Sequence, residues 1–91
     1  MGQKARPQPA RLAEKLLQIR TALDVSQAEM FRLLDVEDSV SYKQLSKYEL
    51  GITEPPLIVL LQYARVAGIC VDVLIDDEQD LPEKLPSKPK H

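Results

Sequence analysis

The chain of 91 residues contains few residues of the kinds that build catalytic or metal centres. It has one cysteine, Cys70, and one histidine, His91, so it can form neither an internal disulfide nor a Cys/His metal cluster. It also lacks a glycine-rich loop that would cradle phosphate. These absences argue against an enzyme and against any cofactor. A lone cysteine is typical of a reducing compartment, so we expect a cytoplasmic protein.

Aromatic residues and long apolar runs are scarce as well. The four aromatic side chains are those of Phe31, Tyr42, Tyr48 and Tyr63. A core must therefore be built mostly from aliphatic residues, a palette that suits helices packed on helices. No apolar run approaches the roughly 20 residues of a membrane-spanning helix, and no signal-peptide core follows the basic start. The sequence thus predicts one small, soluble, unexported domain.

Net positive charge is missing too, although the charges are unevenly distributed. The formal net charge is −2, whereas DNA-binding domains are usually basic. Residues 1–20 nevertheless carry five positive charges against one negative, and residues 21–40 carry one positive against five negative. The overall charge argues only weakly against nucleic acid, because a local basic face would suffice.

Apolar periodicity predicts five short helices, near residues 10–23, 26–35, 41–50, 56–67 and 71–76. The best local signal is a capping box, in which Ser26 precedes Glu29 by three residues. We expect Ser41 to cap the third helix and Gly51 to end it. The predicted organisation is a flexible basic arm (1–9), an all-α domain (10–76) and a proline-rich flexible tail (77–91).

Several spaced motifs agree in order with those of one known family. They are Arg20, Ser26-Gln27-Ala28-Glu29-Met30, Leu45-Ser46-Lys47-Tyr48-Glu49-Leu50-Gly51, Glu54-Pro55, Leu57, Leu60, Ala64, Gly68-Ile69 and Val71-Asp72-Val73-Leu74. In this order the chain resembles the Xre/Cro-repressor helix-turn-helix family over about residues 11 to 76. The resemblance implies a five-helix, lambda-repressor-like domain that acts as a sequence-specific DNA-binding transcription regulator.

The resemblance also implies a set of contacts to double-stranded DNA, with the third helix in the major groove. The implied residues are Gln27 at a phosphate, Tyr42, Lys43 and Lys47 toward base edges, and Ser41 and Gln44 beside them. The pattern itself supports the two lysines, which lie one turn apart and opposite Leu45, where an ammonium can reach guanine N7 and O6. Considered without the family, the lysines also fit a solvated face, Tyr42 fits packing and Gln27 fits an ordinary surface position.

Two further contacts are expected around this helix. The resemblance implies a partly buried ion pair between Arg20 and Glu49, which would fix the angle of the third helix. The basic residues Lys4, Arg6 and Arg11 are expected to hold phosphates.

The chain departs from the family at the link between the second and third helices. The link is about four residues longer than usual, counted from Val36 to Leu45, and it is acidic through Asp35, Glu37 and Asp38. Phe31 stands where the family usually has alanine, so its ring must push the helices apart or turn away. These departures favour an alternative function, that of a protein-interaction or antitoxin-like module with weak or no DNA binding.

Apolar residues in the last two helices indicate a homodimer, because exposed apolar patches commonly form such interfaces. The candidates are Ile58, Val59, Val73 and Ile75.

Overall fold

The computed structural model describes residues 9–86 of the chain. It contains five helices, and these residues form no strand: α1 (Leu12–Leu23), α2 (Gln27–Leu34), α3 (Lys43–Leu50), α4 (Leu57–Ala67) and α5 (Val71–Ile75). The all-α fold and its five predicted helices are confirmed, with helix ends that shift by one or two residues. Lys4, Arg6 and residues 87–91 lie outside the described part of the chain.

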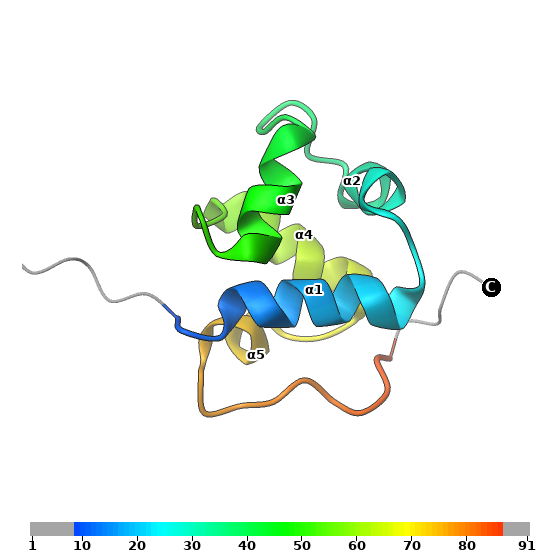
Figure 1. Ribbon diagram of the computed structural model, residues 1–91. Coiled ribbons are helices and arrows are strands. Elements are labelled where there is room, and N and C mark those ends of the chain that lie inside the picture. The colour runs from blue at the N-terminus through cyan, green and yellow to red at the C-terminus, as the bar shows by residue number, and fades with distance from the viewer. Residues whose placement is uncertain (1–8, 87–91) are drawn as a thin grey trace, which may run out of the picture.

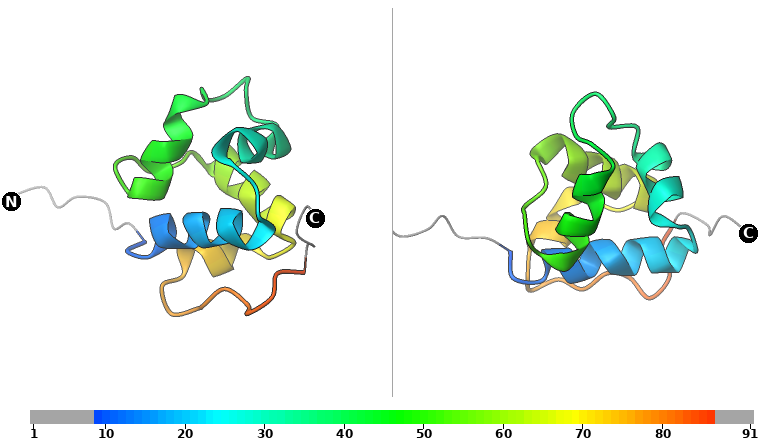
Figure 2. Two further views of the ribbon diagram at one scale, coloured as in Figure 1. Left: turned by 45° about the vertical axis from the view of Figure 1, so that its right-hand side comes forward. Right: turned by 45° about the horizontal axis from the view of Figure 1, so that its top comes forward.

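Helix α1 runs across the middle of the molecule and separates two groups of elements. Helices α2 and α3 lie on one side of it, and α5 with residues 76–86 lies on the opposite side (Figures 1 and 2). The position of α1 between these groups leaves the outer face of α3 away from α5 and from the C-terminal segment.

Over residues 9–86, no helix is both long and apolar enough to cross a membrane.

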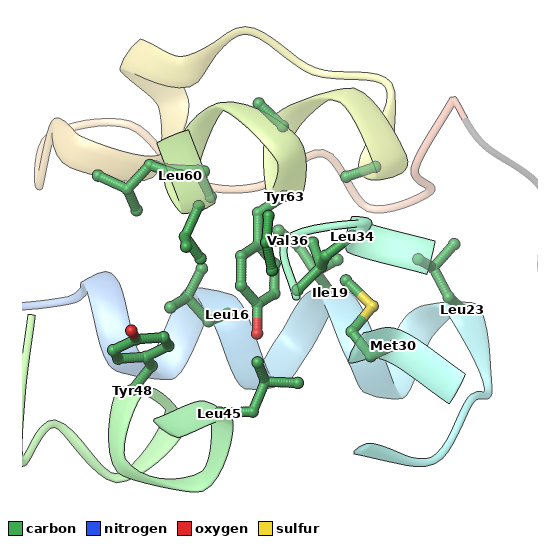
Figure 3. Packing of buried hydrophobic residues seen from close by; sticks show 14 of the residues in the cluster. Leu16, Ile19, Leu23, Met30, Leu34, Val36, Leu45, Tyr48, Leu60 and Tyr63 are labelled. Atoms are coloured by element: carbon green, nitrogen blue, oxygen red, sulfur yellow. The ribbon is translucent and has the colours of Figure 1, made fainter. Parts of the chain in front are cut away.

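The core is a single, mostly aliphatic cluster to which all five helices contribute (Figure 3). Leu16 and Ile19 of α1 are completely enclosed, as are Leu45 of α3 and Leu74 of α5. Tyr63 points from α4 into the space between α1 and α3, toward Leu45. Its hydroxyl has no hydrogen-bond partner among the described residues, and burial raises its pKa above the ordinary tyrosine value.

Local chemistry accounts for most helix ends. Ser26 Oγ accepts from the Glu29 amide and the Glu29 carboxylate accepts from the Ser26 amide, each at 3.1 Å, so the predicted capping box is confirmed. α1 and α2 end at Asp24 and Asp35 in the left-handed region, which aspartate tolerates better than most residues. Gly51 ends α3 as expected, at φ 76°.

The start of α3 differs from the prediction. Ser41 does not cap the helix: the cap position is Tyr42, in right-handed helical geometry and with no side-chain capping bond. Instead, the carbonyls of Ser41 and Tyr42 accept from the amides of Gln44 and Leu45 at 3.0 and 3.1 Å. Each bond joins residues three apart, so the first turn is tighter than an α-helical turn. These backbone bonds fix the start of α3 without a side-chain cap.

Lys15 is a buried cation that the sequence pattern did not single out. Its side chain is fully enclosed, and its Nζ donates to the carbonyls of Val73 and Asp76 at 2.7 and 2.8 Å. These carbonyls lie at the C-terminal end of α5, where a cation complements the helix dipole. The ammonium therefore holds the short α5 against α1.

Residues 77–86, part of the predicted flexible tail, contact the helical domain. The Asp77 carboxylate accepts from the Ala10 and Arg11 amides at 2.8 and 3.0 Å, just before α1 begins. Leu81 and Leu85 are partly buried against the core. Because Arg11 offers no side-chain cap of its own, a carboxylate from the other end of the domain serves the orphan amides before α1.

Asp77→Ala should lower the Tm by several degrees at neutral pH, because the amides before α1 lose their acceptor. The amide hydrogen bonds lower the pKa of Asp77 below its ordinary value. The stabilisation is therefore fully present above the unfolded pKa of about 3.9 and is lost as the pH falls through the lower folded value. Thermal unfolding between pH 7 and pH 2 measures this difference, with Glu83→Ala as the exposed acidic control. A constant difference across this range would contradict the assignment.

Candidate nucleic-acid interface

Helix α3 turns one face to the core and the other to solvent. Leu45, Tyr48 and Glu49 are buried between α3 and its neighbours, whereas Lys43 and Lys47 are exposed on the other face. Neither lysine forms an ion pair with any residue in the range 9–86. Both ammonium groups are therefore available to an external acceptor.

A bidentate ion pair fixes α3 to α1, as predicted. Arg20 Nε donates to Glu49 Oε2 at 2.7 Å, and its Nη2 donates to Oε1 at 3.1 Å. Glu49 is only 4% exposed in its side chain, against 21% for Arg20. The hydrogen bond to Glu49 is the main reason that the pKa of Arg20 lies above its ordinary value. Arg20 also donates to the Val25 carbonyl at 3.2 Å, which links the pair to the α1–α2 connection.

Gln27 joins this pair from the first turn of α2. Its Nε2 donates to Glu49 Oε1 at 3.0 Å, and the side chain is half-buried. One of its two amide hydrogens is therefore committed inside the protein, which positions the group against α3. The predicted phosphate contact of Gln27 stays a prediction, and it would use the second hydrogen.

The long connection between α2 and α3 is anchored to the core rather than extended into solvent. Val36 is buried, Val40 is partly buried, and the Val36 carbonyl accepts from the amides of Ser39 and Val40 at 2.8 and 3.0 Å. The side chains of Glu37 and Asp38 are exposed. The extra residues thus form an ordered turn whose acidic side chains are exposed.

Phe31 resolves its predicted steric conflict by turning toward that connection. Its ring is partly buried and meets the Tyr42 ring edge to face, with centroids 5.8 Å apart and planes at 73°. The sequence pattern did not predict the ring contact between Phe31 and Tyr42. A signal was present nevertheless, because the unusual aromatic in α2 and the aromatic before α3 are two of only four in the chain.

The structure brings most of the predicted DNA-binding residues together at the start and outer face of α3. The exposed members are Ser41, Tyr42, Lys43 and Lys47, and Gln44 is half-buried among them. Arg11 is placed elsewhere, because its guanidinium donates to Asp80 at 2.6 Å and to the Asp77 carbonyl at 2.9 Å. Arg11 therefore belongs to the α1–tail contact rather than to this surface.

The Arg20–Glu49 pair should be strongly coupled in stability. Arg20→Met leaves a buried carboxylate without its cation and should cost about 3–5 kcal/mol. Arg20→Met with Glu49→Met should cost clearly less than the sum of the two single changes. Urea unfolding of the four proteins measures this, with Arg32→Ala as an exposed arginine control. Additive costs would show that the pair contributes no coupling.

Comparison with known proteins agrees with this geometry. Residues 16–73, more than half of the chain, match the helix-turn-helix family HTH_3. No curated protein and no solved structure matches the chain. The matched residues contain all of α2, α3 and α4 and the connection between α2 and α3. They also contain most of α1 and the start of α5. The chain therefore belongs to HTH_3, the family of DNA-binding helix-turn-helix domains of the Xre, Cro and lambda-repressor type.

Proposed function

We propose that the protein is a sequence-specific transcription regulator that binds double-stranded DNA as a homodimer. In this proposal the N-terminal half of α3 enters the major groove, with Tyr42 and Lys43 toward base edges and Lys47 one turn further along. The observation that carries the proposal is the pair of exposed ammonium groups on a helix whose inner face is held by Leu45 and Glu49.

The distribution of positive charge supports this choice of surface. Arg11, Lys15 and Arg20 each donate to a carboxylate or carbonyl of the protein itself. Lys43 and Lys47 are not, and they stand on one face of a single helix. A rigid helix that presents two uncommitted cations has the chemistry that base edges and phosphates require.

The position of Gln27 also supports the proposal that α3 lies in the major groove. Its bond to Glu49 holds the start of α2 beside α3, so a phosphate contacted there would fix the register of α3 in the groove. The arm residues Lys4 and Arg6 are proposed to reach further phosphates. No metal or cofactor is part of this proposal, and the expected cytoplasmic location stays a prediction.

The proposed dimer surface changes in the light of the structure. Val59 is fully buried, so it is corrected to a core residue, whereas Val73 is half-buried and Ile75 is exposed. The most exposed large apolar residues flank the α3–α4 connection: Leu50 at 72%, Ile52 at 64%, and Leu57 at 83%. Ile58, at 46%, adjoins them at the start of α4. We propose this patch as the contact between two copies, because burial of such side chains is favourable.

A second function, that of a protein-interaction or antitoxin-like module, is favoured by one observation. Glu37 and Asp38 are exposed in the connection that leads to α3, where they would repel nearby phosphates. Salt-dependent retention on random-sequence DNA separates the two functions. A protein that elutes at the lowest salt and selects no sequence would fit the interaction module.

Lys43→Ala should weaken binding to a DNA sequence selected from a random pool by about 1–3 kcal/mol and relax discrimination at one base pair. Lys47→Ala should also weaken binding, since its ammonium shares the outer face of α3. Titration by fluorescence anisotropy at fixed salt measures both effects.

Lys84→Ala is the matched control for these lysines. It removes the same charge from the segment on the opposite side of α1 and should leave affinity nearly unchanged. If Lys43→Ala and Lys47→Ala bind as tightly as the wild type, α3 does not read the groove.

Leu57→Ser should shift the protein from dimer to monomer, because it removes the most exposed apolar side chain of the proposed patch. Sedimentation equilibrium over a range of concentrations measures the mass, with Leu33→Ser on α2 as a control of comparable chemistry. A wild-type protein that keeps the monomer mass at every concentration would rule out this dimer.

A further inference from the structure

The contact between Phe31 and Tyr42 joins the two helices of the helix-turn-helix unit immediately beside the proposed groove-facing surface. It is a T-shaped contact, a geometry that aromatic pairs favour, since the positive ring edge meets the negative face. The two rings differ in environment. Phe31 is half-buried and packs against the core, whereas Tyr42 is 47% exposed. One ring is thus anchored and the other is presented to solvent.

Both the backbone and the side chain of Tyr42 are held before any ligand arrives. Its carbonyl accepts from the Leu45 amide at 3.1 Å, which fixes the residue to the first turn of α3. Its ring is held by Phe31 of α2, whose backbone is itself part of a helix. An exposed tyrosine loses rotamer freedom on binding, and prior ordering by a neighbour reduces this cost.

We infer that Phe31 is a positioning residue that holds the Tyr42 ring as a specificity determinant for thymine. The inference rests on the proposed function, because it requires α3 in the major groove. The group recognised is the thymine C5 methyl, the apolar feature of the groove that an aromatic ring can contact. Phe31 acts through Tyr42 and does not touch the base.

The long α2–α3 connection fits this role. It is anchored by Val36 and Val40, so the chain reaches Tyr42 along an ordered path. The Phe31 side chain and the α2–α3 connection meet in one contact, since the connection ends at the residue that Phe31 supports.

The test replaces thymine by uracil at each position of the selected DNA site, which removes only the methyl group. Wild-type protein should lose affinity at one position in each half-site. Phe31→Leu keeps an apolar side chain but removes the ring, and it should reduce the thymine-to-uracil affinity ratio at that position by roughly two- to tenfold, the range expected for an aromatic pair. Phe31→Tyr retains a ring and should keep the ratio.

Tyr42→Ala keeps the test decisive if Phe31→Leu does not fold, because Tyr42 is substantially exposed. It should abolish the thymine-to-uracil ratio, and Tyr42→Phe should preserve it. Where Phe31→Leu folds, adding it to Tyr42→Ala should change the ratio no further. Equal weakening on thymine and uracil by Phe31→Leu would mean a merely structural role, and an unchanged ratio in Tyr42→Ala would also overturn the inference.

The Lys43→Ala and Lys47→Ala proteins separate this inference from the proposed function. If these changes weaken binding while Phe31→Leu or Tyr42→Ala leaves the ratio intact, only the role of the aromatic pair is wrong. If the lysine changes have no effect, or no DNA sequence is selected, groove reading itself is wrong and the inference falls with it.

Discussion

The orientation of α3 depends on a carboxylate that is almost fully removed from water. Glu49 is tolerable there only because Arg20 binds both of its oxygens and Gln27 adds a third hydrogen bond. These donors come from α1 and α2, so one group fixes three helices at once. Because the angle of α3 determines where Lys43 and Lys47 point, the arrangement of the outer surface follows from a contact on the inner one.

The distribution of charge shows why a net charge of −2 is compatible with a DNA-binding family. Some acidic residues hold the protein together: Asp77 supports the start of α1 and Glu49 secures α3. The Arg20 cation that Glu49 binds is mostly buried. At α3, a polyanion such as DNA would meet the two ammonium groups of Lys43 and Lys47. It would also meet the exposed carboxylates of Glu37 and Asp38 in the preceding connection.

The sequence predicted the features that depend on local periodicity and capping, namely the five helices and the Ser26 capping box, and family resemblance supplied the Arg20–Glu49 pair. The sequence did not predict contacts between residues that are far apart along the chain. The acceptor for the amides before α1 is Asp77, which no local pattern relates to them. Lys15 lies on the same helical stripe as Leu12, yet spacing alone does not reveal which carbonyls would bind it. The predicted Ser41 cap is wrong because the first turn is closed by backbone bonds that place Tyr42 at the cap position.

Because Lys15 is fully enclosed, its chemical reactivity can report the separation of α5 from α1. An acylating reagent modifies an amine only where water can reach it, so Lys15 reacts in those molecules in which α5 has separated from α1. Lys43 stands in solvent and reacts in the closed state. The ratio of the two labelling rates therefore reports the opening equilibrium between α5 and α1, and comparison with global unfolding shows whether this end of the domain opens on its own.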